Sequence, residues 1–280
     1  MCIRDRAAVA FRNFAAAAET TYFPIIHCAT SFGHYKETRQ QLLHDPELRA
    51  QVRKILGKLG KKLVMPEEIV HYSEWVHAVR DLIAEKQVIP MQHIAATIHP
   101  ACHYHKLVAE DAVYSDEVHG AQRSAIITST LRALGIDVRD YSTWSDCCGF
   151  GFRHILVSRD FSRSFAVQRK IEVMKEEANP DVLITHDTGC VTTLDQSQFA
   201  AKAHGHNVGL PVMSDSQLAA LAMGAHPYKV LQLHWHSTDS KPFLAKLGID
   251  VEKKWHEFET ACAELKSGKK QFMTWEDADA

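Results

Sequence analysis

Four cysteines in three short stretches have the residue types and spacing that could do chemistry in this chain. Cys147 and Cys148 are adjacent, within Asp-Cys-Cys-Gly-Phe-Gly, whereas Cys102 lies in His-Pro-Ala-Cys-His-Tyr-His and Cys190 ends His-Asp-Thr-Gly-Cys. Adjacent cysteines rarely form a disulfide with each other, because the small ring strains both the peptide and the disulfide. Four thiolates are enough to bind one iron–sulfur cluster. The first hypothesis is therefore a redox protein whose metal site joins distant parts of one domain.

Zinc is the main alternative metal, because mixed sets of cysteine and histidine suit it and Cys102 is surrounded by His99, His103 and His105. A simpler role for these histidines is hydrogen bonding around the loop. A histidine beside a redox centre could also relay protons, and His103 is the best candidate by position. Two further alternatives are a thiol enzyme that uses the adjacent cysteines without a metal and a set of buried, unreactive thiols.

The sequence gives less information on the roles of Cys28, Cys262 and the histidine pair of His234 and His236. Cys28 is interpreted as a remaining metal ligand of an incomplete first site, or alternatively as a buried apolar thiol. Cys262 lies within a predicted helix without companion ligands and is expected to be structural. If Leu233 to His236 formed a strand, alternation would place His234 and His236 on one face, at an edge that faces solvent or a partner.

Composition restricts the class of protein. The chain has 280 residues, of which 46% are hydrophobic and 24% charged, with a formal net charge of −2. These values predict a sizeable core and no general attraction to nucleic acid. No apolar stretch approaches the roughly 18 residues of a membrane span. Seven cysteines without dense spacing favour a reducing compartment, hence the cytoplasm. Gly149-Phe150-Gly151 lacks the third glycine of a dinucleotide site, so a flavin or nicotinamide would be bound by a partner.

Hydrophobic runs and turn residues predict alternating strands and helices, which indicates an α/β fold with largely parallel sheets. The cysteines follow predicted strands, and ligand sites in such sheets gather beyond the carboxyl ends of the strands. The predicted strands are residues 21–28, 95–98, 136–141, 182–185 and 210–213. The predicted helices are residues 7–19, 34–43, 45–59, 67–85, 118–134, 161–178, 214–223 and one from 251, followed by a polar tail.

The cysteine pattern resembles the cysteine-rich CCG domain found in the B subunit of heterodisulfide reductase and in related redox proteins. The resemblance rests on Cys102, then Cys147-Cys148-Gly149, then Cys190, and on Ile98-His99-Pro100-Ala101-Cys102-His103. Residues 28–36 and 45–48 resemble the end of a first copy of that domain, and residues 210–224 and 241–248 resemble the close of a second.

The resemblance implies two similar Rossmann-like CCG units, of which the first is incomplete. Residues 7–94 would be the remainder of the first unit, residues 95–250 the second, and residues 251–280 a helical and polar tail. Residues 1–6 resemble translated adapter sequence and are predicted to be non-native, so that the chain would be truncated at its start.

The same resemblance implies the activity: an iron–sulfur redox subunit of a heterodisulfide-reductase-like complex, moving electrons to or from a thiol, disulfide or sulfur substrate. Its implied partners are an iron–sulfur protein like the family's C subunit and a flavin-containing protein like the family's A subunit. Cys102, Cys147, Cys148 and Cys190 would bind the cluster. The alternative is a non-catalytic, zinc-stabilised interaction subunit of such a complex.

The sequence departs from the family pattern at two cysteine positions. Ser31 stands at the fourth position of Cys-x-x-Cys in the first copy, and Thr193 stands there in the second. The second copy thus keeps four thiolates rather than five, which favours a single [4Fe-4S] cluster over the larger assembly of the family.

Overall fold

The strands that precede Cys102, the Cys147-Cys148 pair and Cys190 lie together in one parallel sheet. We describe a computed structural model, which defines residues 3–20, 23–105, 125–151, 154–206 and 208–267. The sheet has the order β4-β3-β5-β6 and all its pairings are parallel. Its strands are β3 (Ala95–His99), β4 (Asp137–Val138), β5 (Val182–Thr185) and β6 (Val212–Ser214). The predicted α/β class with parallel sheets is confirmed.

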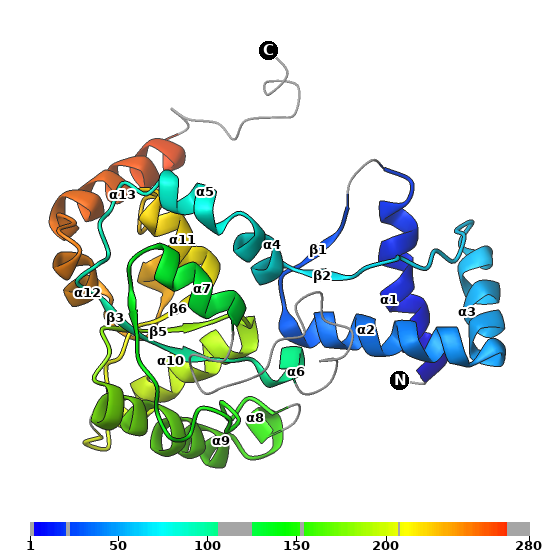
Figure 1. The fold of residues 1–280 in the computed structure, drawn as a ribbon, viewed down its shortest axis with the longest axis horizontal. Coiled ribbons are helices and arrows are strands. Elements are labelled where there is room, and N and C mark those ends of the chain that lie inside the picture. Colours follow the sequence, from blue (N-terminus) through cyan, green and yellow to red (C-terminus); the bar gives the residue numbers. More distant parts are fainter. Residues whose placement is uncertain (1–2, 21–22, 106–124, 152–153, 207, 268–280) are drawn as a thin grey trace.

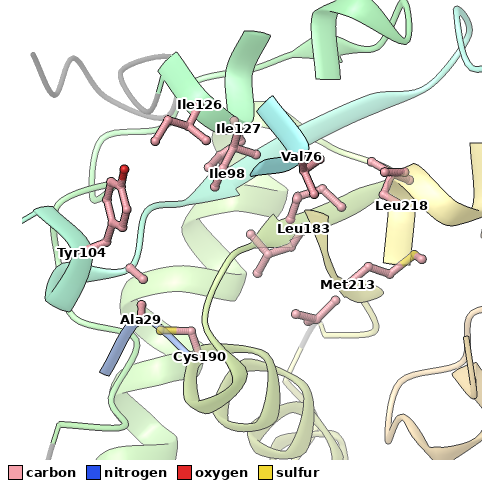
Figure 2. Close-up of a cluster of buried hydrophobic side chains, with 14 of the residues drawn as sticks. Ala29, Val76, Ile98, Tyr104, Ile126, Ile127, Leu183, Cys190, Met213 and Leu218 are labelled. Atoms are coloured by element: carbon pink, nitrogen blue, oxygen red, sulfur yellow. The ribbon is translucent and has the colours of Figure 1, made fainter. Parts of the chain in front are cut away.

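Helices cover both faces of this sheet, as Figure 1 shows. On one face lie α7 (Ala125–Ala133) and α11 (Asp215–Ala222), and on the other α9 (Arg159–Ala166) and α10 (Thr188–Lys202). Every residue of β3 and β5 is buried, as expected of parallel strands covered on both sides. The core between sheet and helices includes Ile98, Leu183, Met213 and Leu218, and Figure 2 shows Cys190 at the edge of the same cluster.

The helix predicted over residues 161–178 is continuous but not regular. After α9 it runs through a π turn at Val167–Ile171 and a second at Met174–Ala178. It ends at Asn179, which has a left-handed backbone. This irregular helix lies against the loop that contains the cysteine pair, and π turns are often found at functional sites.

The N-terminal part forms a second, two-stranded parallel sheet of β1 (Ile25–Ile26) and β2 (Val70–His71). Its helices are α1 (Ile3–Ala17), α2 (Ala29–His44) and α3 (Pro46–Lys58), drawn in blue in Figure 1. The predicted cap of α3 is present, since Asp45 accepts a 2.9 Å hydrogen bond from the Leu48 amide. The predicted strand over 21–28 is shorter than expected, and α2 begins directly after Cys28.

The single helix predicted over residues 67–85 is wrong. Residues 70–71 pair with β1, and two short helices follow, α4 (Tyr72–Ala78) and α5 (Arg80–Glu85). The start of α4 is stabilised by a capping box, in which the His71 amide donates to Glu74 at 2.7 Å and the Ser73 amide donates to the His71 ring at 3.2 Å. Pairing with a strand some 45 residues away therefore overrides local helix periodicity.

Two further predictions on the C-terminal side need correction. Residues 233–235 form a 3₁₀ turn, so His234 and His236 do not alternate on a strand. The strand predicted over 136–141 is limited to β4, because only two of its residues pair with β3. The predicted C-terminal helix is present as α13 (Val251–Lys266), preceded by α12 (Lys241–Lys246). Two four-residue helices, α6 (Cys102–His105) and α8 (His154–Val157), complete the elements named here. Among the described residues, no helix has the length and apolar character of a membrane span.

Candidate metal centre

The four predicted cysteines converge at the carboxyl end of the parallel sheet. Cys102 begins α6 just after β3, and Cys190 lies in the first turn of α10 just after β5. Cys147 and Cys148 lie in the loop that follows β4. Because these strands are parallel neighbours, the loops after them meet, and cysteines far apart in sequence come together as the pattern predicted.

Hydrogen bonds connect the four sulfur atoms in a row. Cys147 interacts with Cys102 and with Cys148, and Cys148 interacts in turn with Cys190. The hydrogen bonds from Cys102 and Cys148 hold the pKa of Cys147 far below its usual range, whereas the bonds to Cys147 and Cys190, together with burial, raise the pKa of Cys148. Cys147 is therefore deprotonated more readily than Cys148.

Cys190 is more protected. The hydrogen bond with Cys148 lowers its pKa, but burial and the nearby Asp187 carboxylate oppose that effect, so the net pKa is raised. Only 4% of Cys190 and 2% of Cys148 are exposed. Buried thiols of this kind are suited to a metal that deprotonates them by its own charge.

The backbone after the cysteine pair turns toward sulfur. The Gly149 amide donates to Cys147 Sγ at 3.4 Å, and the Phe150 amide donates to Cys148 Sγ at 3.5 Å. Gly149 has φ +90°, and a Cβ there would lie 2.5 Å from the Ser162 carbonyl oxygen. The glycine is therefore required by both its backbone conformation and its close packing.

Asp187 connects the N-terminal part to this centre, a role that sequence reasoning missed. Its side chain caps α10 by accepting from the Cys190 amide at 3.0 Å. It also accepts from Cys28 Sγ at 3.5 Å and from the Thr30 amide at 3.3 Å. An aspartate three residues before Cys190, at the start of a predicted helix, is the signal that could have indicated the cap. Cys28 thus contacts the loop of the four-cysteine centre.

The histidines beside Cys102 have different surroundings. His103 is buried, its Nδ1 lies 3.6 Å from Cys102 Sγ, and burial lowers its pKa while Asp187 and Cys147 raise it. A ring nitrogen of His99 and the sulfur atoms of Cys148 and Cys190 all lie within 4.8 Å of one another. The side chain of His105 lies outside the described residues.

The positions that depart from the family pattern also differ in their surroundings. Thr193 is buried one turn after Cys190 on α10, and its hydroxyl has no hydrogen-bond partner in the part of the chain that the structure describes. Ser31 lies in the first turn of α2, three residues after Cys28. Cys262 is half-buried on α13, and none of the four cysteines of the candidate centre lies on that helix.

Lys170, which the sequence analysis did not identify, is completely buried beside the loop of the cysteine pair. Its ammonium donates to the carbonyl oxygens of Thr143 and Trp144. Burial lowers the pKa of Lys170 to about 7, while Asp146 and three of the cysteines raise it. A lone lysine in a helical pattern gives no sequence signal for such a position.

Comparison with known proteins agrees with this geometry. A model of the cysteine-rich (CCG) domain matches residues 96–195. The chain is 30% identical to a heterodisulfide reductase B-subunit-like protein of Archaeoglobus profundus, over 80% of this chain and 74% of the relative. It is 28% identical to the B subunit of the ferredoxin:CoB-CoM heterodisulfide reductase of Methanosarcina acetivorans, over 87% and 79% of the two chains.

A solved structure has a similar fold. A hypothetical protein from Helicobacter pylori aligns with a TM-score of 0.65 at 15% identity. The alignment covers 85% of this chain but 42% of that one, so the chain spans less than half of the length of this neighbour.

Proposed function

The chain belongs to the family of proteins like the B subunit of heterodisulfide reductase, and from this premise we propose that it is an iron–sulfur redox subunit. Cys102, Cys147, Cys148 and Cys190 would bind one [4Fe-4S] cluster. The observation that supports this most is the row of four hydrogen-bonded sulfur atoms supplied by three separate loops.

The residues present fit such a group. All four donors are soft sulfur ligands, which iron–sulfur clusters require. Two backbone amides donate to the sulfur atoms of the pair, and such bonds tune the reduction potential of a cluster. Thr193, which stands at the sequence position of the family's fifth cysteine, is buried, and its hydroxyl has no hydrogen-bond partner among the described residues. If one iron of the cluster lacks a cysteine ligand, a substrate sulfur could coordinate to that iron in place of the absent fifth cysteine.

A bound cluster would supply electrons one at a time to a thiol, disulfide or sulfur substrate. Reduction of a disulfide takes up two electrons and two protons and yields two thiols. His103 is the proposed proton donor, because its ring is buried beside Cys102. The electrons would come from, or pass to, two partners in the cytoplasm: an iron–sulfur protein like the family's C subunit and a flavin-containing protein like the family's A subunit.

Metal analysis tests the cluster directly. Anaerobic reconstitution should give a brown protein with about four iron and four sulfide per chain. C148S should lose the colour and most of the iron, whereas C262S should retain both. Iron binding that is equal in the two variants would contradict the proposed ligand set. Spectra that a thiol substrate leaves unchanged would exclude the open iron position.

Cys28 needs its own variant, because it was interpreted as a remaining ligand of the first site. Its thiol donates to Asp187, which caps the helix of Cys190. If Cys28 is a ligand, C28S should lose iron as C148S does. Full iron content with an unchanged spectrum would leave Cys28 a role in hydrogen bonding only.

One observation favours a second candidate, the zinc-stabilised interaction subunit. His99, Cys148 and Cys190 offer three ligand atoms within 4.8 Å of one another, and mixed sets of this kind suit zinc. Under this hypothesis the protein is colourless, contains one zinc per chain, and loses stability when the metal is chelated.

A further inference from the structure

A cavity of about 410 Å³ lies between the carboxyl ends of the strands of both parallel sheets. Its lining includes His27 directly after β1, Tyr72 directly after β2, Asp187 two residues after β5, and Asp215 directly after β6. None of the four cysteines of the candidate centre is among the described residues that line it. Small-molecule sites have volumes of this order, and in parallel sheets they lie at this end of the strands. The cavity is therefore a candidate ligand site separate from the metal centre.

Two buried carboxylates determine the charge of this cavity. Asp187 and Asp215 are each 4% exposed, and no lysine or arginine is found in the part of the lining that the structure describes. The hydrogen bonds that the two side chains accept come from neutral donors, which are backbone amides, the Cys28 thiol and the Ser73 hydroxyl. Such bonds stabilise the carboxylates but leave their charge in place.

The histidines of the lining do not compensate both carboxylates. His186 Nε2 accepts from the Ala101 amide at 2.9 Å, so this nitrogen has no proton and the ring is neutral. His27 packs on Tyr72 at 5.5 Å and is the histidine whose charge acts on Asp215. With one histidine against two carboxylates, the lining keeps a net negative charge even when His27 is protonated.

The starts of α10 and α11 do not make the cavity a site for anions. Amide groups at the first turn of a helix can bind an anion. Here, however, the Cys190 amide donates to Asp187 at 3.0 Å, and the Ser216 amide donates to Asp215 at 2.9 Å. The side chains of the protein thus take the place that an anionic ligand would need, and an anion would also be repelled by them.

From this lining we propose that the cavity binds a small organic molecule that has a protonated amine on a short hydrocarbon chain. The amine would lie beside Asp215, where a carboxylate can accept a charge-assisted hydrogen bond. The chain would lie against Val191 and Leu231, which supply apolar surface to the same cavity. The assignment of the amine depends on the cavity alone.

The identity of the substrate rests in addition on the proposed function. Asp187 belongs both to the wall of the cavity and to the surroundings of Cys190, whose amide it binds. If the centre acts on sulfur compounds, the substrate is then an amine-bearing thiol or disulfide rather than an acidic one.

Three probes of equal chain length and different charge test the proposal by isothermal titration calorimetry of the full chain. They are hexane-1,6-diamine, hexane-1,6-diol and adipate, none of which has a sulfur that could react with the cysteines. At about pH 8 the amines are protonated and Asp215, with its pKa raised to about 6, is ionised. The diamine should bind at least about tenfold more tightly than the diol, and adipate should bind least. Equal affinities, tightest binding of adipate, or no binding of the diamine would overturn the proposal.

Substitution of Asp215 tests its role directly. D215N should weaken binding of the diamine about tenfold or more, because the amide keeps the acceptor but loses the charge. D81N, at a side chain that is 83% exposed, is the control and should keep the wild-type affinity. Asp187 is left unchanged, because it also caps the helix of Cys190. A folded D215N protein with the wild-type affinity would contradict the proposal.

Val230 allows the same test without a buried substitution. It lines the cavity and is 63% exposed, so it lies at the opening. V230K should weaken binding of the diamine about two- to fivefold, and V230E should strengthen it by a similar factor. The same direction of change in both variants would overturn the proposal.

Metal analysis of the same preparations separates this inference from the proposed function. Binding of the diamine to a chain that takes up no iron would support the inference and contradict the proposed function. A brown chain with about four iron that does not bind the diamine would do the reverse.

Discussion

Gly149 illustrates how strictly the cysteine loop is determined at the level of one residue. Its positive φ disfavours any side chain, and a Cβ would collide with the backbone of Ser162 rather than with a flexible side chain. The turn cannot relax without moving the amide that donates to Cys147. The local conformation and the environment of the sulfur are therefore coupled.

G149A should lower the free energy of unfolding by about 1–3 kcal/mol, because the variant combines backbone strain with a steric clash. Urea denaturation of the metal-free protein measures this loss. Gly57 is the matched control: it lies within α3 and an added Cβ meets no atom within 4 Å. G57A should be neutral or stabilise by about 0.5–1 kcal/mol, and a G149A protein as stable as G57A would contradict the argument.

Asp215 provides a prediction on pH. Burial raises its pKa from 3.8 to about 6, against the hydrogen bonds from Ser73 and the Ser216 amide and the charge of His27, which lower it. The folded protein then binds the proton more tightly than the unfolded chain. This carboxyl contributes stability below about pH 4 that is lost as the pH rises through about 6, a change of about 3 kcal/mol.

D215N should therefore flatten the pH dependence of the free energy of unfolding between pH 4 and pH 6, since the amide does not titrate. Urea denaturation at several pH values measures the slope. D81N, at a carboxylate whose side chain is 83% exposed, is the control and should retain the wild-type slope. A D215N protein that also retains that slope would show that Asp215 ionises as it does in the unfolded chain.

Among the elements, the continuous helix that comprises α9 and the two π turns supports the cysteine loop. Its contacts reach from residue 142 to residue 149 of that loop. Ser162 donates to the Gly149 carbonyl at 2.6 Å, Arg169 pairs with Asp146, and Glu177 accepts from Ser142 at 2.6 Å.

S162A should test this support, because Ser162 is fully buried and its removal leaves the Gly149 carbonyl without that donor. We expect a loss of about 1–3 kcal/mol in the free energy of unfolding and faster release of the metal to a chelator. S164A, at an exposed position of the same helix, should change neither quantity. Equal rates of metal release in the two variants would show that this support from the helix does not contribute to metal retention.

The arrangement of the strands and helices explains which parts of the site could be predicted from the sequence. Cys102 and Cys190 follow buried strands that are recognisable from short apolar runs, so their convergence follows from parallel topology alone. The burial of Lys170 and the contact of Asp187 with Cys28 could not be predicted in this way, because both depend on how elements distant in the sequence pack together. The late start of the helix predicted over 67–85, at Tyr72, depends on a strand pairing that no local window contains.

At the scale of the whole molecule, an aromatic junction connects the two sheets. It consists of Phe32, His71, Tyr104 and His186. Phe32 from α2 stacks on Tyr104 of α6 at 5.2 Å, and Tyr104 packs in turn on His186 at 5.1 Å. His186 accepts from the amide of Ala101, the residue before Cys102. The N-terminal part is thus packed against the cysteine centre and not only connected to it by the chain.

F32A should therefore destabilise both parts of the molecule together. Truncation of a fully buried phenylalanine costs about 3–5 kcal/mol, and because the junction is shared, urea should still unfold the protein in one transition with an unchanged m value. Far-ultraviolet circular dichroism and the fluorescence of the tryptophans, including Trp144 near the cysteine loop, should give the same midpoint.

F161A, at a residue that is 56% exposed, should shift the midpoint little. Two separate transitions in F32A would mean that the sheets fold independently, and Cys28 could then not be held against Asp187 by the packing of this junction.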